Sequence, residues 1–279
     1  MNAIEIKNLT KSYGSFTLDG LNLALPTGCI MGLIGENGAG KSTTIKLILN
    51  MIHRESGSIT VLGHDNTSCN FDKVKEDIGV VLDEPGLPPM LKASEIDRIM
   101  KNIYKNWSSH DFKSYLDKLS VPRNKPFKDF SRGMQMKMGI AIALSHGPKL
   151  LILDEATSGL DPVIRDEVIN LFGEFTRDEN HSVLISSHII SDLEKICDYV
   201  AFLHNGKLIL CEEMNLLYEE YCMAMASSDI INSLPSSAVI GKRETQYGTE
   251  AIIKRGYAPS GIKTTPIDIE KLFIFMSRS

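Results

Sequence analysis

The chain has 279 residues, and its 30 Lys and Arg against 35 Asp and Glu give a formal net charge of -5 at pH 7. The hydrophobic content of 43% is typical of a folded globular protein with one large domain or two ordinary ones. The mildly acidic composition argues against nucleic acid as a partner, because a protein that binds it electrostatically normally carries a basic face.

Three further classes are disfavoured by the sequence. The longest apolar run, 138–144, is much shorter than the roughly 20 residues that a membrane-spanning helix needs. The first ten residues include Glu5 and Lys7 and lack the apolar core of a signal peptide. The five cysteines are odd in number and form no Cys-x-x-Cys pair, which argues against a disulfide scaffold or a cysteine zinc site. We therefore expect a soluble protein of a reducing cytosol.

The first motif joins a predicted strand to a predicted helix. Residues 29–34 are an apolar run of strand length, and apolar residues recur at helical spacing over 45–52. Between them, residues 35–42 (GENGAGKS) match GxxxxGK[ST], the pattern of a phosphate-binding loop. Its glycines let backbone N–H groups surround a β-phosphate, Lys41 can reach the β- and γ-phosphates, and the Ser42 hydroxyl can bind Mg²⁺.

Amphipathic helices are predicted in the middle of the chain. The first, which Ser94 is expected to cap, carries a stripe of Ile and Met over 96–103. The second carries Phe, Tyr and Leu at helical spacing over 112–119, and a third apolar stretch ends at Leu144. We expect these stripes to pack into a protein core rather than to contact a ligand.

A second predicted strand ends on two carboxylates. Residues 150–153 are consecutive apolar residues, which suits a strand buried on both faces of a parallel sheet. Asp154 and Glu155 follow at its carboxyl end, where α/β sheets bind ligands. Next to a phosphate loop, Asp154 is a candidate for the Mg²⁺ shell and Glu155 for the base that deprotonates an attacking water. Asp161 is then predicted to cap a helix that begins at Pro162.

A further strand places a histidine beside this region. The β-rich run 182–186 is followed by Ser187 and His188, and a histidine at a strand end can hydrogen-bond a γ-phosphate or an attacking water. Helical spacing over 189–197 predicts a helix, and an Asn-Gly turn predicts a β-hairpin over 199–210.

In this order, the motifs resemble those of the ATP-binding cassette (ABC) family, the ATPase subunits of ABC transporters, over residues 4–210. The resemblance implies an α/β fold, the P-loop NTPase of the ABC type, with an N-terminal antiparallel β subdomain and a helical subdomain at about 84–146. It implies a nucleotide-binding domain at 1–215 and a small C-terminal α+β extension, with an accessory role, at 216–279. ATP and Mg²⁺ are the implied cofactors.

The resemblance also assigns roles to single residues. Tyr13 matches the aromatic residue that stacks on adenine, His188 matches the switch histidine, and Asp161 ends the loop that crosses the dimer interface. Glu155 and His188 are the implied catalytic residues. The implied ATP ligands are Tyr13, Gly35, Asn37, Gly38, Ala39, Gly40, Lys41, Ser42, Thr43, Ser131, Gly133 and Asp161.

Two segments depart from the family pattern. The signature LSGGQ appears as FSRGM at 130–134, with Ser131 and Gly133 kept and Arg132 in place of a glycine. This spelling resembles that of exporters of antibiotics and peptides. Asp83 occupies the usual glutamine position of the Q-loop. With Ser42 and Asp154 it is a candidate contact of Mg²⁺, although its carboxylate is shorter and charged.

The resemblance implies an ATP-hydrolysing motor subunit of an exporter of drugs, antibiotics or amphipathic peptides, such as those of the bacitracin and phenol-soluble-modulin types. One cassette without a membrane span implies a second ATPase subunit, identical or not, whose signature serine completes each site. It also implies separate transmembrane permease subunits that hold the chain at the cytoplasmic face of the cell membrane.

Two other functions stay open. One is a non-transport ABC protein, similar to translation factors or DNA-repair ATPases. Those branches normally carry paired cassettes or long coiled-coil insertions, which 279 residues do not accommodate. The other is an ATP-binding regulator that has lost hydrolysis, which the departures at Asp83 and Arg132 favour.

Overall fold

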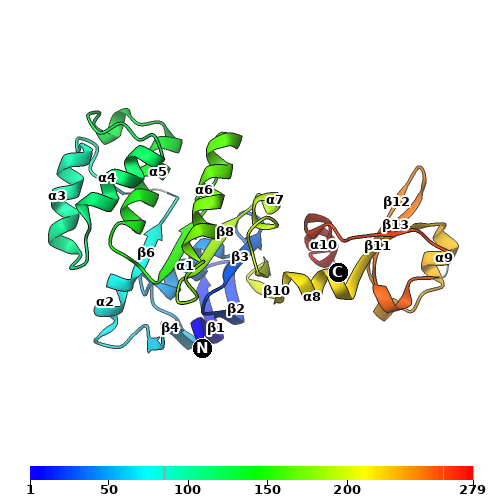
Figure 1. The fold of residues 1–279 in the computed structure, drawn as a ribbon. Helices are drawn as coiled ribbons and strands as arrows, with labels where there is room; N and C mark the ends of the chain where they lie inside the picture. The colour runs from blue at the N-terminus through cyan, green and yellow to red at the C-terminus, as the bar shows by residue number, and fades with distance from the viewer. Residues whose placement is uncertain (84–85, 260, 279) are drawn as a thin grey trace.

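A mostly parallel sheet lies at the centre of the larger lobe, residues 1–213 (Figure 1). The computed structural model describes residues 1–83, 86–259 and 261–278. In spatial order the strands are β10 (Lys207–Glu213), β9 (Tyr199–His204), β3 (Ile30–Gly35), β8 (Ser182–Ser187), β7 (Leu150–Asp154) and β6 (Ile78–Val81). Neighbouring strands are parallel except for the edge pair β10 and β9.

Runs of buried residues explain why these strands are central. Every residue of β3, β7 and β8 is buried, as expected for parallel strands covered on both faces. The strand predicted at 150–153 is confirmed, and the one predicted at 29–34 is observed one residue later. The hairpin predicted over 199–210 is also confirmed, because His204 pairs with Lys207 across its turn.

An antiparallel sheet covers one face of the central sheet and confirms the predicted N-terminal β subdomain. Its apolar side chains share one buried cluster with α1 (Lys41–Ile48) and with the central strands; Ile4, Ile45 and Leu184 are members. In spatial order the strands of this sheet are β2 (Phe16–Pro26), β1 (Asn2–Tyr13), β4 (Ser56–Val61) and β5 (His64–Asp65).

The predicted helical subdomain consists of α3, α4 and α5, on the side of the larger lobe away from the C-terminal residues (Figure 1). Its predicted first residue, Glu84, lies outside the described residues, as does Pro85. The helices of the larger lobe, besides α1, are α2 (Phe71–Val74), α3 (Ala93–Ile103), α4 (Ser109–Lys118), α5 (Arg132–Leu144), α6 (Pro162–Phe175) and α7 (Ile190–Leu193).

Two helix predictions need correction. Ser94 does not cap α3: Lys92 occupies the cap position, and its backbone N–H donates to the Glu95 carboxylate at 2.9 Å. The helix predicted over 189–197 is helical over Ile190–Leu193. The chain turns away because Asp198 makes two hydrogen bonds with Ile30, one through each backbone N–H, which draw it into β9.

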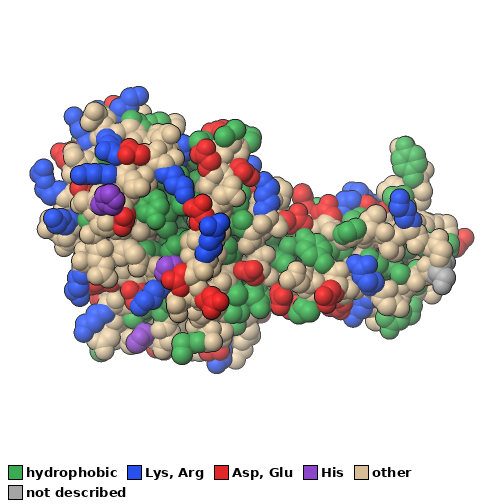
Figure 2. Space-filling model, in the orientation of Figure 1, with side chains coloured by type: hydrophobic (Ala, Val, Ile, Leu, Met, Phe, Trp, Pro, Cys, Tyr) green, Lys and Arg blue, Asp and Glu red, His purple; other side chains and the backbone are tan. Residues whose placement is uncertain are grey.

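Residues from Met214 onward form an extension that projects from the side of the larger lobe (Figure 1). Figure 2 shows it as a narrower lobe, with acidic side chains gathered at the neck. Its sheet has the order β12 (Val239–Thr245), β13 (Gly248–Lys254), β11 (Tyr221–Ala226) and β14 (Thr264–Thr265). Its α-helices are α8 (Met214–Glu220), α9 (Ser228–Asn232) and α10 (Ile269–Met276).

The extension has the predicted α+β composition, which confirms the fold class. The boundary at 215 and 216 stays a prediction, because α8 runs across it, and the predicted last residue, Ser279, is not among the described residues. Within the part of the chain that the structure describes, none of the helices has both the length and the apolar composition to cross a bilayer.

Gly79 sets how closely β6 approaches α5. A Cβ at this position would lie 2.6 Å from the Ala143 carbonyl oxygen and from the Leu151 side chain. We expect Gly79→Ala to lower the free energy of unfolding by about 1–3 kcal/mol, the usual effect of overpacking a core. Urea denaturation measures it.

The control is Gly173→Ala in α6, where a Cβ would meet no described atom within 4 Å. This substitution should raise stability by about 0.5–1 kcal/mol, because alanine loses less backbone entropy in a helix. Equal effects of the two substitutions would contradict the assigned packing.

His146 makes stability depend on pH. Its side chain is 1% exposed and stacks on Tyr104 at 4.0 Å, and its Nδ1 lies 3.1 Å from the Glu76 carbonyl oxygen. Burial lowers the pKa of His146 below its ordinary value of 6.5, although the contact with Glu76 opposes this. The unfolded chain therefore binds the proton more tightly, so stability is full above pH 6.5 and is lost as the pH falls further.

We expect the free energy of unfolding to fall as the pH is lowered through 6.5, and His146→Gln to reduce that fall. Urea titrations at several pH values measure it. His110→Gln, at an exposed position on α4, is the matched control. The same pH dependence in both variants would disprove the assignment to His146.

Candidate functional site

The carboxyl ends of β3, β7 and β8 lie side by side at one edge of the central sheet. In the parallel register Asp154 at the end of β7 pairs with Ser186 on β8, whose other neighbour is β3. The phosphate loop follows β3, Glu155 follows β7 and His188 follows β8. The fold therefore brings together three groups that are far apart in the sequence.

The loop between β3 and α1 has the geometry of an anion site. The backbone φ is +84° at Gly38 and +113° at Gly40, where residues with a Cβ are strained. None of the described side chains caps α1, so its first N–H groups can donate to an anion that the helix dipole also favours. The neighbouring predicted ATP ligands are Gly35 at the end of β3, Asn37 and Ala39 in the loop, and Ser42 and Thr43 in the first turn of α1.

Lys41 is buried, with 6% of its side chain exposed. Its Nζ donates to the carbonyl oxygens of Gly35 at 2.7 Å and Glu36 at 3.3 Å, and lies 3.5 Å from Oε1 of Glu155. The Lys41 ammonium is thus already paired with oxygen atoms of the loop and of Glu155. A phosphate that binds to Lys41 has to replace these contacts.

Glu155 links the phosphate loop to His188, the predicted switch histidine. Its Oε2 lies 2.6 Å from Nδ1 of His188, while Oε1 faces Lys41. Its φ of +53° is in the left-handed region, an uncommon conformation that costs of the order of 1–3 kcal/mol. The hydrogen bond from its backbone N–H to the Ser186 carbonyl oxygen, at 3.1 Å, stabilises that conformation.

Asp154 is buried, and its Oδ1 accepts a 2.6 Å hydrogen bond from Ser186 Oγ. Ser186 Oγ also accepts the backbone N–H of Glu155 at 3.1 Å. Carboxylate, hydroxyl and phosphate oxygens are the ligands that Mg²⁺ prefers, so Asp154 and the exposed Ser42 fit this ion. Ser186 was missed in the sequence, where the available signal is a serine in a buried apolar strand.

Tyr13, the predicted adenine-stacking residue, ends β1 and is 45% exposed. The Nζ of Lys11 lies 5.1 Å from the centre of its ring and 3.7 Å from the Glu55 carboxylate. A base that stacks on Tyr13 therefore uses the other ring face or displaces Lys11.

The predicted contacts with a second subunit serve as helix caps within this chain. Ser131 Oγ accepts the backbone N–H of Met134 at 3.3 Å at the start of α5. The Asp161 carboxylate accepts the backbone N–H of Ile164 at 3.2 Å and so caps α6, as predicted. A Cβ on Gly133 would lie 3.3 Å from Leu160, so the two loops are neighbours. Their roles toward ATP stay predictions.

The two departures from the family pattern contact each other. Arg132 Nη2 lies 2.5 Å from Asp83 Oδ1, and the Arg132 side chain also packs beside Gly159. Both charged side chains are at least half exposed, so solvent screens the pair and its contribution to stability is about 0–1 kcal/mol. Asp83 is therefore paired in this structure, and its contact with Mg²⁺ stays a prediction.

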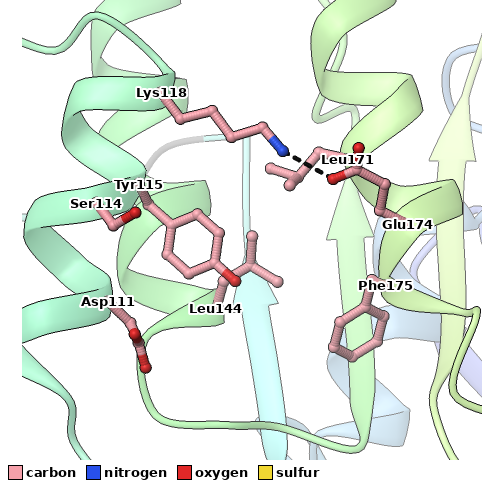
Figure 3. A pocket seen from close by; sticks show the side chains of 8 residues that line it. All are labelled: Asp111, Ser114, Tyr115, Lys118, Leu144, Leu171, Glu174 and Phe175. Atoms are coloured by element: carbon pink, nitrogen blue, oxygen red, sulfur yellow. Dashed lines mark hydrogen bonds and ion pairs between the residues drawn. The ribbon is translucent and has the colours of Figure 1, made fainter.

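A cavity of about 380 Å³ lies apart from the phosphate loop, between the helical subdomain and α6 (Figure 3). An ion pair of 2.7 Å joins Lys118 of α4 to Glu174 of α6 across it. The cavity belongs to the contact between subdomains. Its lining residues are Asp111, Ser114, Tyr115, Lys118, Leu144, Leu171, Glu174 and Phe175.

We expect Ser186→Ala to weaken the binding of Mg²⁺-ATP roughly 10-fold or more, as losses of hydrogen bonds to metal ligands commonly do. It should also lower stability by about 1–3 kcal/mol, because a buried carboxylate loses its donor. Isothermal titration calorimetry and urea denaturation measure the two effects.

Ser182→Ala is the matched control. Ser182 is equally buried, lies at the other end of β8, and accepts one hydrogen bond, from the Gly28 N–H at 3.0 Å. It should lose stability but not affinity for Mg²⁺-ATP. Equal affinities of the two variants would refute the role of Ser186 at the metal site.

Comparisons with known proteins agree with this geometry. A family model described as ABC transporter matches residues 18–158. The lantibiotic transport ATP-binding protein SrtF of Streptococcus pyogenes is 38% identical over 213 residues, 75% of this chain and 90% of that protein. The bacitracin transport ATP-binding protein BcrA of Bacillus licheniformis is 38% identical over 209 residues, 74% of this chain and 68% of that protein.

Solved structures agree as well. An ATP-binding subunit of an ABC transporter superposes with a TM-score of 0.70 at 26% identity, over 77% of this chain and 91% of that one. A dimeric ATP-binding cassette bound to ADP and Pi has a TM-score of 0.68 at 23% identity, over 76% and 98%, and so supports the fold alone. The family match spans half of the chain, and the chain covers most of the length of these relatives. The chain therefore belongs to the ABC transporter family, as one of its ATP-binding cassette ATPases.

Proposed function

We propose that this ATPase is the motor of an exporter that moves antibiotic or amphipathic peptides through separate transmembrane subunits. The proposal that the chain hydrolyses ATP rests on the position of the Glu155 carboxylate, which lies between Lys41 and His188. The substrate class rests on the relatives named for lantibiotic and bacitracin transport. The acidic composition argues against nucleic acid as a partner.

Binding of ATP rearranges the contacts of Lys41. The γ-phosphate competes with the carbonyl oxygens of Gly35 and Glu36 for the ammonium, and draws it away from Glu155. Ser42 and Asp154 would hold Mg²⁺, with Asp83 as a further contact, and the ion would there neutralise charge on the phosphate oxygens. The phosphate-loop N–H groups orient the remaining oxygens.

Once released from Lys41, the Glu155 carboxylate can accept a proton from the attacking water. Nδ1 of His188 is 2.6 Å from this carboxylate, so the histidine can orient it or hydrogen-bond the γ-phosphate beside it. The left-handed backbone at Glu155 aims the side chain at the phosphate loop. Catalysis then depends on position rather than on covalent chemistry.

A second ATPase subunit would complete the site. In the proposed dimer, Ser131 and Gly133 at the start of α5 and Asp161 at the start of α6 face the ATP of the partner. A homodimer and a heterodimer with a sister ATPase both satisfy this geometry. Docking on the transmembrane subunits would hold the dimer at the cytoplasmic face of the membrane.

An ATP-binding regulator without hydrolysis is the rival function. The two residues that depart from the family pattern, Asp83 and Arg132, pair with each other. They do not disturb the contact between Glu155 and His188, which hydrolysis would need. This arrangement favours an active ATPase.

We expect Glu155→Gln to lower kcat for ATP hydrolysis by roughly 100-fold or more, the usual effect of losing a general base. ATP binding should persist, because the phosphate loop is unchanged, and the ATP-bound dimer should accumulate. Phosphate release and size-exclusion chromatography with ATP measure the two effects.

Glu179→Gln, an exposed substitution in the turn before β8, is the control and should hydrolyse ATP like the unaltered chain. Undiminished hydrolysis by Glu155→Gln would contradict the assignment of the base. An unaltered chain that binds ATP without hydrolysing it, alone and with membrane subunits, would favour the regulator.

A further inference from the structure

The extension contacts the cassette directly behind the switch histidine. His188 is followed by the short helix α7, and α10 of the extension packs against α7. The backbone N–H of Ile269, the first residue of α10, donates to Oε1 of Glu194 at 3.0 Å. Glu194 immediately follows α7, so only five residues of chain lie between His188 and this hydrogen bond.

Apolar packing makes the same connection. Phe273 of α10 meets Phe202 of β9 edge to face, with 5.4 Å between the ring centres. Ile190 and Leu193 of α7 belong to one buried cluster with Ile269 and Phe273, each at most 7% exposed. The extension is therefore continuous with the core of the cassette at α7, and is not joined to it by the chain alone.

The opposite side of α7 is held by α6. Arg165 of α6 forms an ion pair of 3.6 Å with the buried Asp192 of α7, and its Nη2 donates to the Leu160 carbonyl oxygen at 3.2 Å. Leu160 precedes Asp161 in the loop predicted to face a second subunit. The helix after His188 thus lies between that loop and the extension.

A helix as short as α7 has little stability of its own. None of the described side chains caps it, so its position depends on contacts with its neighbours: Leu193 lies beside Gly32 of β3, and Arg165 of α6 and the N-terminus of α10 add polar contacts. Glu194 is on the exposed side of this contact; partial desolvation and the nearby Asp268 and Glu270 raise its pKa, and the hydrogen bond from Ile269 opposes the rise.

We propose that the extension positions the switch histidine through α7, which makes Glu194 and Phe273 positioning residues for ATP hydrolysis. The inference rests on the proposed hydrolysis at Glu155 and His188. It gives residues from Met214 onward a role in catalysis, although none of those that the structure describes contributes a group to the site. Loss of the α10 contact lets α7 and His188 depart from the Glu155 carboxylate, while the phosphate loop stays intact.

The test uses the full chain with Glu194→Ala and Phe273→Ala. We expect each to lower kcat for ATP roughly fivefold or more, the scale of a typical coupling between sites, and to leave KM within about twofold. Glu194→Gln keeps an acceptor for the Ile269 N–H and should restore most of kcat. Tyr247→Ala, 79% exposed in the turn between β12 and β13, is the control within the extension.

Phe273→Ala leaves a cavity and could unfold the chain, so Glu194→Ala, which removes no core side chain, is decisive. A folded Glu194→Ala chain with unchanged kcat would overturn the proposal. So would a rise in KM that accounts for the whole effect, or an equal loss of kcat in Tyr247→Ala.

Hydrogen–deuterium exchange separates this proposal from the function on which it rests. We expect faster exchange of backbone N–H groups over 187–194 in Glu194→Ala than in the unaltered chain or in Tyr247→Ala. Unchanged exchange there would refute the positioning role, whether or not the chain hydrolyses ATP. Faster exchange in a chain without hydrolysis would refute the proposed ATPase motor and keep the contact.

Discussion

The Glu155 carboxylate is the point on which the candidate site depends. One oxygen faces Lys41 and the other Nδ1 of His188, so one residue connects the phosphate loop, β7 and the segment after β8. This geometry requires the parallel register that pairs Asp154 with Ser186. A slip in register would separate Glu155, the proposed base, from His188, so the fold and the proposed chemistry depend on the same sheet.

Local sequence patterns predict much of the fold and part of the candidate site. The apolar runs of β3, β7 and β8 predict buried parallel strands, because each strand makes its own hydrophobic contacts wherever its neighbours lie. The cap of Asp161 was predictable for the same reason, since an N-cap acts within three residues of itself. Contacts between residues close together in the chain can therefore be predicted from short stretches of sequence.

Contacts between segments that are distant in the chain could not be predicted from local patterns. Ser186 looks like any strand serine until the sheet places it beside Asp154. Arg132 and Asp83 read as two separate defects, and they form a pair once α5 lies beside the loop after β6. The length of α7 was overestimated for a related reason: Asp198 bonds to Ile30 in another strand, and that contact ends the helical spacing.

Contacts between distant segments offer a way to change the rate of ATP hydrolysis without changing the sequence motifs. The phosphate loop and the Glu155 backbone are fixed by φ angles and hydrogen bonds within a few residues of the sheet. The segment after His188 also contacts α6 and α10, and we propose that these contacts help to position the histidine. On this proposal, substitutions in those two helices would move His188 while every predicted ATP ligand stays the same. The rate of hydrolysis is thus separable from nucleotide binding, and the extension is where we expect that separation to act.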